Sequence, residues 1–360
     1  MKVIARIARR TGTLISLALL CVVPLRAQDQ PKLTIDEDCP AFAFAPDGRI
    51  VYAVQHVFKT KVYDLERDDI WIVSPEGKRV RIVNGEKLVK TNSPFSYGIQ
   101  SLSWSPDGRR FLAQMLTNQV ISARGDTLEG ELADLFESDG REINIAGLHN
   151  SAIPEAYQAV WLSDGGTVVF LSEAVKPKLL YEIDAIRPIG GRGASTFDGH
   201  VFSAVSWDPA HNSAVAIERD KTLTGPIRLV QLDLIKETRR ELATLDAFLG
   251  QLTISPSGTK VAYFRDGETL EVRDLASPEQ ATKVTVAYGR FAWSRDERRV
   301  LLKRGLERHS GDLVWVTLAD GTLEPALHGL VFKDFQLSPD GHSLGVTQPG
   351  KRSLMVYSLP

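Results

Sequence analysis

Histidines are the side chains of this 360-residue sequence whose placement could support chemistry. Neutral imidazole binds transition metals, and it exchanges protons near neutral pH. No two of the five histidines named below have a ligand spacing such as His-x₃-His, and the sequence fixes no carboxylate beside them. We therefore expect no metal and no other cofactor. Five of the seven histidines lie in or beside long polar segments between apolar runs: His56, His149, His200, His309 and His328.

Other catalytic motifs are missing from the sequence. It contains no Gly-x-Ser-x-Gly turn and no His-Glu-x-x-His pair, which mark hydrolase nucleophiles and zinc peptidases. The glycine-rich run 190–193 precedes no helical pattern, so we interpret it as a loop and not as a phosphate site. An acidic cluster lacks the glycine of a calcium loop, and we expect it to be a solvated loop. Its members are Asp64, Glu66, Asp68 and Asp69.

A repeat organises most of the chain. Each copy has an aromatic or apolar residue, a tight turn of the Ser-Pro-Asp-Gly type and then an apolar strand. Successive copies follow one another at steps of 39 to 60 residues. A repeat of about 40–50 residues with strands and tight turns is typical of a propeller blade. The seven copies are 44–48, 104–108, 161–165, 207–211, 254–258, 293–297 and 337–341.

Each part of the repeat has a physical role in the blade. Proline presets φ in the turn, and glycine accepts the positive φ that closes the hairpin. The first strand alternates large and small residues, as Phe42 and Phe44 do around Ala43, which indicates a strand with two different faces. Four of the six tryptophans end a first strand, where a large ring can fill the space between blades. We interpret these four as core residues: Trp104, Trp161, Trp207 and Trp293.

The seventh blade is one strand short. Its third strand, 353–357, ends three residues before the last residue, while the apolar segment 32–36 has no other role in the pattern. Because a closed ring leaves no unpaired strand edge, we expect 32–36 to be the missing strand. The predicted fold is all-β. It is a seven-bladed β-propeller of four-stranded antiparallel blades, closed by an N-terminal strand that completes the last blade.

The run Trp-Ser-Pro-Asp-Gly with its short apolar strand resembles the WD-repeat-like blades of TolB-type propellers. The resemblance is strongest at 104–113, 254–264 and 337–346, and it extends from about residue 36 to residue 360. It implies a propeller whose blades serve partner binding, peptidase gating or some lyase activities in different proteins. The chain has no room for the N-terminal α/β domain of TolB, so the resemblance concerns the propeller.

Residues 1–27 have the pattern of a signal peptide. A basic start precedes the apolar run 11–25, and Ala27 provides a small residue for cleavage. We expect the mature propeller domain, 28–360, to be periplasmic or extracellular, without a transmembrane segment. It carries 38 basic and 45 acidic side chains, a net charge of about −7, which argues against a nucleic-acid partner. Its one cysteine, Cys39, can form no internal disulfide, and we expect it to be buried.

The loops between blades, and those between the second and third strands of a blade, meet at one mouth of the channel. The longest departures from the repeat there are 55–69 in blade one and 118–135 in blade two. We expect partly helical structure at 127–136 and a short fourth strand of blade two at 142–145. The side chains expected to bind a partner at this mouth are His56, Lys59, Lys61, Tyr63, Tyr97, His149, Tyr157, His309 and Lys333.

The sequence favours an exported, non-enzymatic propeller. Its partner would be a protein or a cell-envelope ligand, bound at the channel mouth and at the loops of blades one and two. An alternative stays open. A propeller enzyme, either a metal-assisted polysaccharide lyase or a lactonase-like hydrolase, would use the channel-mouth histidines.

Overall fold

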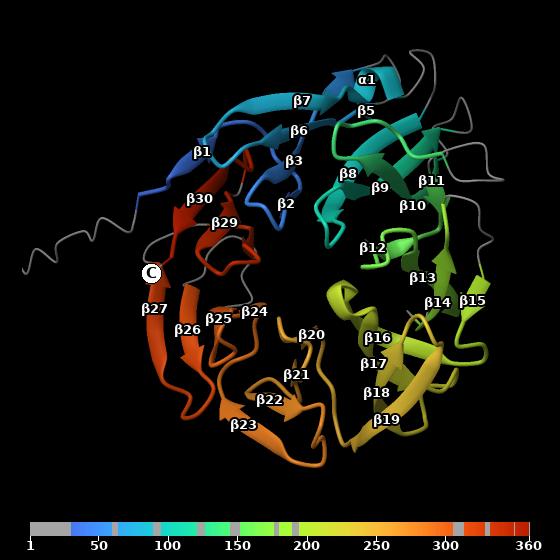
Figure 1. The fold of residues 1–360 in the computed structure, drawn as a ribbon, viewed down its shortest axis with the longest axis vertical. Helices are drawn as coiled ribbons and strands as arrows, with labels where there is room; N and C mark the ends of the chain where they lie inside the picture. Colours follow the sequence, from blue (N-terminus) through green and yellow to red (C-terminus); the bar gives the residue numbers. More distant parts are fainter. Residues whose placement is uncertain are drawn as a thin grey trace, which may run out of the picture.

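The computed structural model is a ring of antiparallel sheets around a central opening (Figure 1). It describes residues 30–59, 64–88, 95–120, 127–144, 152–175, 180–188, 194–304, 313–327, 332–348 and 350–359. Within these ranges the chain forms seven blades of four strands each, which confirms the predicted fold class. The predicted signal peptide, 1–27, and the glycine-rich run 190–193 lie outside the described residues.

The first four blades follow the chain. Blade one contains β2 (Phe42–Phe44), β3 (Ile50–Val54), β6 (Asp69–Val73) and β7 (Arg79–Val83), with an inserted hairpin of β4 (Val57–Lys59) and β5 (Asp64–Glu66) and a short α1 (Gly85–Leu88) behind it. Blade two contains β8 (Phe95–Trp104), β9 (Arg110–Val120), β10 (Thr127–Glu137) and β11 (Ala152–Pro154). Blade three contains β12 (Tyr157–Trp161), β13 (Val168–Val175), β14 (Leu180–Ile186) and β15 (Ala194–Thr196). Blade four contains β16 (Val201–Asp208), β17 (Ser213–Arg219), β18 (Ile227–Asp233) and β19 (Thr238–Leu245), with the 3₁₀ turn η2 (Pro209–His211).

The last three blades are the most regular. Blade five contains β20 (Leu252–Ile254), β21 (Lys260–Phe264), β22 (Thr269–Asp274) and β23 (Ala281–Thr285). Blade six contains β24 (Phe291–Trp293), β25 (Arg299–Lys303), β26 (Leu313–Thr317) and β27 (Leu323–Leu327). Blade seven contains β28 (Asp334–Leu337), β29 (Ser343–Thr347), β30 (Leu354–Ser358) and, from the start of the described chain, β1 (Leu33–Ile35).

Strand β1 completes blade seven, as the sequence predicts. It pairs antiparallel with β30, with Leu33 opposite Val356 and Ile35 opposite Leu354. Ile35 and Leu354 are both fully buried in the core between blades seven and one. Cys39 lies in the same core, where burial raises the pKa of its thiol to about 12, so this cysteine is a packing residue.

Two of the four tryptophans at the ends of first strands hydrogen-bond to the preceding blade. Trp104 donates its indole N–H to the carbonyl of Ala43 in blade one at 3.2 Å. Trp293 makes the equivalent bond to Thr253 in blade five at 3.1 Å. The guanidinium of Arg49 lies 4.9 Å from the centre of the Trp104 ring, which adds a cation–π contact across the same boundary. These rings are structural residues, as their repeated position indicates.

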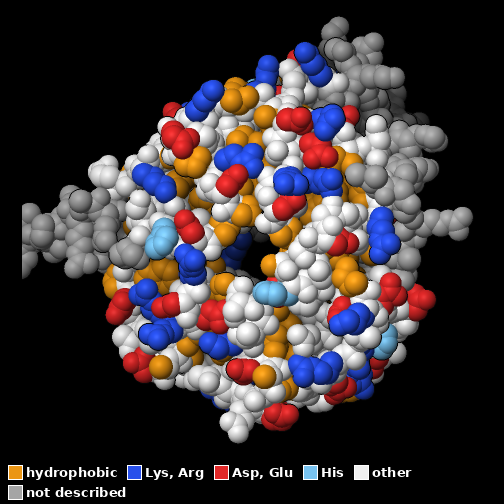
Figure 2. All heavy atoms as spheres, in the orientation of Figure 1, with side chains coloured by type: hydrophobic (Ala, Val, Ile, Leu, Met, Phe, Trp, Pro, Cys, Tyr) orange, Lys and Arg blue, Asp and Glu red, His pale blue; other side chains and the backbone are white. Residues whose placement is uncertain are grey.

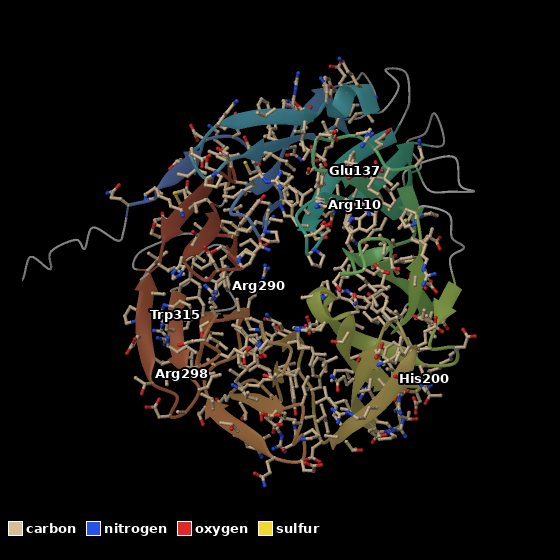
Figure 3. The ribbon with its side chains drawn as sticks, viewed as in Figure 1. Arg110, Glu137, His200, Arg290, Arg298 and Trp315 are labelled. Atoms are coloured by element: carbon tan, nitrogen blue, oxygen red, sulfur yellow. The ribbon has the colours of Figure 1, made fainter. Side chains whose placement is uncertain are left out.

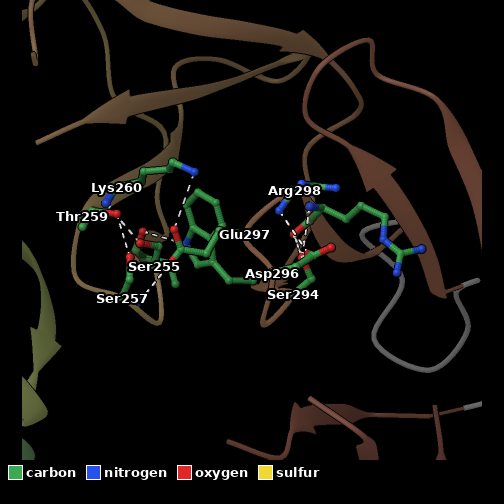
Figure 4. A network of polar contacts seen from close by, with 11 residues as sticks. Ser255, Ser257, Thr259, Lys260, Ser294, Asp296, Glu297 and Arg298 are labelled. Atoms are coloured by element: carbon green, nitrogen blue, oxygen red, sulfur yellow. Dashed lines mark hydrogen bonds and ion pairs between the residues drawn. The ribbon is translucent and has the colours of Figure 1, made fainter. Parts of the chain in front are cut away.

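The turns that follow the first strands form a repeated hydrogen-bond pattern on one face of the ring. In blade six, Ser294 Oγ lies 2.6 Å from Asp296 Oδ1 and accepts the N–H of Arg299 at 3.0 Å. Blade five has Ser257 where most copies have aspartate, and Glu297 of the next blade accepts its N–H at 2.6 Å (Figure 4). On this side of the ring, which we call the turn face, these serine, aspartate and glutamate side chains therefore find partners within and between neighbouring turns.

Two predictions for blade two are wrong. Residues 127–136 are not helical, because β10 (Thr127–Glu137) pairs along its whole length with β9 and the sheet ladder overrides local helix propensity. The fourth strand is β11 (Ala152–Pro154), which pairs with 132–134 of β10. Glu142 makes only an isolated bridge to Phe136. The strand expected at 142–145 is thus displaced by a later segment.

Candidate functional site

The side of the ring opposite the turn face contains a cavity of about 600 Å³ where blades seven, one and two meet. We call it the channel-mouth cavity. Segments from both ends of the described chain reach it, together with the inserted hairpin β4–β5 and the first strand of blade two. Its lining consists of Pro40, Gln55, Val57, Glu66, Asp68, Gly98, Ile99, Gln100, Leu116, Lys333 and Arg352.

Asp68 is the most unusual side chain of this cavity. It precedes β6 and is only 1 % exposed. Its Oδ2 accepts the backbone N–H of Ile99, in blade two, at 2.8 Å, whereas its buried Oδ1 has no hydrogen-bond partner. Burial, assisted by the neighbouring Glu66 charge, raises the pKa of Asp68 to about 7. The carboxyl group therefore changes its charge near neutral pH.

A polar chain links blades seven and one beside Asp68. Arg352 donates its Nε–H to Asp38 and its Nη2–H to the side-chain oxygen of Gln55. Gln55 in turn donates its amide N–H to Glu66 at 2.7 Å. The hydrogen bond to Asp38 is the main reason why the pKa of Arg352 is raised. Asp38 is thus the main partner of the guanidinium, whose charge also interacts with those of Asp68 and Glu66, the two acidic groups of the cavity lining.

Gly98 gives the Glu66 carboxylate its space. A Cβ atom at position 98 would lie 2.4 Å from Glu66 Oε2, well inside van der Waals contact. A side chain at position 98 would therefore displace the carboxylate end of Glu66 from its present position. The position of Glu66 depends on a glycine outside the repeat turns.

Beside the cavity, the hairpin β4–β5 exposes apolar surface. Val57 is 49 % exposed and Phe58 is 37 % exposed. The buried Arg67 guanidinium lies 5.9 Å from the centre of the Phe58 ring. Exposed apolar side chains next to a polar cavity are typical of a surface that binds another molecule.

The predicted partner-binding residues fall into different places. Lys333 is exposed and lines the cavity. His56 directly precedes β4 and is not part of the cavity lining; its Nε2 is 3.3 Å from Asp69 Oδ2. Tyr157 lies in blade three against Tyr181, with ring centres 5.7 Å apart, and is not part of the cavity lining. Lys59 and Tyr97 belong to β4 and β8, and their side chains are outside the description. Lys61, Tyr63, His149 and His309 lie outside the described residues.

The acidic cluster is not the solvated loop that the sequence predicts. Asp68 and Asp69 are 1 % and 4 % exposed. Asp69 accepts the N–H of Gly85 at 2.9 Å and pairs with Arg81 at 3.1 Å. The sequence did contain a signal for this burial, because Asp68 directly precedes the buried strand β6 and Asp69 is its first residue.

No catalytic or metal-binding arrangement of histidines is found among the described residues. His200 lies toward the outside of the ring in Figure 3, hydrogen-bonded to Glu218 and away from the central opening. Arg290 lies nearer the central opening, paired with Asp334. Among the described residues, no group of three or more histidine, cysteine or acidic side chains has an arrangement that could hold a metal ion.

Figure 2 shows one face of the molecule, with the central opening as a hollow and charges of both signs spread around it. In the part of the chain that the structure describes, no helix has the length and apolar character needed to cross a membrane. These observations leave the channel-mouth cavity as the candidate site, because it combines volume, a buried group with an unpartnered oxygen and exposed apolar surface.

Comparison with known proteins supports the fold. No protein-family model and no curated protein sequence matches the chain. Among solved structures, it is similar to the β-propeller domain of Cps50 (Swd1) from Myceliophteria thermophila, with a TM-score of 0.58 and 13 % sequence identity. The similarity covers 92 % of this chain and 99 % of that domain. At this identity the likeness shows a shared WD40-like propeller architecture.

Proposed function

We propose that this chain is an exported, non-enzymatic propeller that binds a protein or cell-envelope partner through the channel-mouth cavity and the hairpin β4–β5. The observation that carries the proposal is the cavity of about 600 Å³ beside the exposed Val57 and Phe58. Interfaces combine such apolar anchors with a polar pocket that fixes orientation. The propeller supplies a rigid frame for both.

The finer parts of the proposal rest on the sequence. The basic and apolar pattern of 1–27 supports export, and the TolB-type resemblance of the blades supports a setting in the cell envelope. N-terminal sequencing of the protein from its native host tests export, with a mature start expected near Gln28. A mature protein that retains residues 1–27 would contradict it.

Site-specific photo-crosslinking tests the binding face. A photoreactive residue at Val57 or at the exposed Gln100 is expected to give a discrete adduct in the native host. The same residue at Glu76, exposed in a turn on the turn face, is the matched control and is expected to give none. Adducts from Glu76 but not from Val57 and Gln100 would place the interface on the wrong side of the ring.

A further inference from the structure

We propose that the channel-mouth cavity is a binding site for a protonated amine or a guanidinium group, with Asp68 as its counter-ion. This deepens the proposed function, since a lysine, an arginine or a free amine of the partner could supply the cation. The site itself rests on contacts within this chain.

The first observation is the buried carboxylate oxygen without a partner. Asp68 is 1 % exposed and lines the cavity, yet its Oδ1 accepts no hydrogen bond. A buried acceptor left unpaired costs about 1–3 kcal/mol, and a charged one costs more. A cationic N–H donor that enters the cavity would remove this cost. It would gain a charge-assisted hydrogen bond, which is stronger than one between neutral groups.

The second observation is the sign of the charges around that oxygen. Glu66 contributes a second carboxylate, fixed by Gln55 at 2.7 Å and pressed against Gly98. Arg352 also lines the cavity, where its Nε–H donates to Asp38 and its charge interacts with those of Asp68 and Glu66. His56 points its imidazole toward Asp69 instead. Once Asp68 is ionised, the lining contains two carboxylates, Glu66 and Asp68, and two cations, Arg352 and Lys333, and the buried oxygen that lacks a hydrogen-bond donor belongs to Asp68.

Lys333 is the exposed cation of the lining, and its charge opposes a cationic ligand. It is exposed and lines the cavity from the start of blade seven. Its position predicts that removing its charge strengthens the binding of an amine. An anionic ligand would behave in the opposite way, so Lys333 distinguishes the two classes of ligand.

The test is isothermal titration of the mature chain with butylammonium. Neutral n-butanol and anionic butyrate serve as matched probes of the same size. We expect saturable binding of butylammonium only. Because the pKa of Asp68 lies at about 7, its ionised fraction rises about tenfold between pH 6 and pH 8, and the affinity is expected to rise in parallel. Binding that is independent of pH, or equal binding of n-butanol, would overturn the proposal.

Variants locate the effect. Asp68→Asn is expected to weaken butylammonium binding at pH 8 at least about tenfold and to remove its pH dependence, because the counter-charge is lost. Asp208→Asn replaces another buried aspartate, on the turn face beside His211, and is expected to leave binding unchanged. Lys333→Ala, at an exposed position, should raise the affinity about twofold to threefold. If Asp68→Asn fails to fold, the Lys333 variant and the pH series still decide, and unchanged or weaker binding in Lys333→Ala would contradict the proposal.

The result is separable from that of the proposed function. Amine binding without any crosslinked partner would refute the scaffold role and leave the site intact. A partner crosslinked at Val57 that binds Asp68→Asn as well as the native chain, with no butylammonium binding, would refute the site and leave the scaffold role intact.

Discussion

Two cavities of similar volume lie at opposite ends of the seam between blades seven and one. The one on the turn face has about 560 Å³ and the channel-mouth cavity about 600 Å³. On the turn face, Lys32 donates to Ser343 at 2.7 Å, and Ser338 accepts the N–H of Ser343 at 2.9 Å. At the channel mouth, Asp68 keeps a buried oxygen without a partner.

The difference teaches where the repeat ends and specific function can begin. Turn-face groups find partners within the repeat, since each turn brings its own serine, aspartate and glycine. The channel mouth is built from segments that occur once, namely an inserted hairpin, the start of β8 and the β29–β30 connection. An unsatisfied buried carboxylate persists only when the surrounding structure holds it, and such groups concentrate at functional sites.

The largest expected effect concerns the seam itself. Deletion of residues 28–37 removes β1, exposes the edge of β30 and opens the core around Ile35. We expect the melting temperature to fall by about 10 °C or more, since several buried contacts and a strand pairing are lost together. Differential scanning calorimetry measures it, with deletion of 28–30, before the β1 pairing, as the control. Equal melting temperatures for both deletions would mean that β1 contributes nothing to closure.

The second prediction concerns the effect of the Asp68 charge, at the channel mouth, on the stability of the fold. Its pKa is raised from 3.8 to about 7, so the folded state binds more protons than the unfolded state between these values. Stability should therefore fall as pH rises through this window, and the loss is complete above pH 7. Asp68→Asn removes this cost and is expected to stabilise the fold by about 1–3 kcal/mol at pH 8, with little change near pH 4. Urea titration at both pH values checks it, and a destabilised variant at pH 8 would show that the carboxylate is satisfied.

The third prediction tests a satisfied group on the turn face. Ser294 is buried and its Oγ accepts the N–H of Arg299 at 3.0 Å. Ser294→Ala leaves that N–H without its partner and should cost about 1–2 kcal/mol in the free energy of unfolding. Ser277→Ala, outside the repeat turns, is the control. The sign is opposite to that of Asp68→Asn, and two substitutions with the same sign would erase the distinction between the faces.

The smallest effect sharpens how neighbouring turns depend on one another. Ser257 holds the place of the usual aspartate, and Glu297 of blade six accepts its N–H at 2.6 Å. Ser257→Asp restores the common residue but brings two carboxylates together, so we expect a loss of about 0.5–1 kcal/mol.

Combining Ser257→Asp with Glu297→Gly completes a double-mutant cycle that measures the coupling between the two turns. Glu297 has a φ of +55°, where glycine is favoured, so Glu297→Gly itself should cost little. In that background Ser257→Asp is expected to be neutral or stabilising. An additive double-mutant cycle would show that the two turns are independent.

The sequence allowed the ring to be predicted because its determinants are local and repeated. Trp104, Gly108 and their equivalents report a strand end or a positive φ wherever they occur, and the unmatched segment 32–36 indicated how the ring closes. The register of β10 was harder, because pairing with β9 outweighs local propensity. Of the residues predicted to bind a partner, Lys333 lines the candidate cavity, whereas Asp68 was assigned to a solvated loop and is buried.

The reason is that the burial of Asp68 depends on contacts distant in sequence. Ile99, whose N–H donates to Asp68, is 31 residues away, and Arg352 reaches Gln55 across 297 residues. A loop carboxylate has no periodic pattern that would reveal such neighbours. The enclosure of Asp68 by blades seven, one and two becomes visible only in the folded ring.

The closing strand has a consequence for how the molecule forms. Asp36 and Ser353, hydrogen-bonded at 3.0 Å, are separated by 317 residues. During synthesis the partner of β1, β30, emerges after the first six blades, so these blades can form while the seventh still presents a bare edge to other chains. An export route that delivers the chain unfolded would postpone this vulnerable state until the whole ring is across the membrane. Whether the chain closes into a ring or aggregates then depends more on when β1 pairs with β30 than on how much that pairing stabilises the fold.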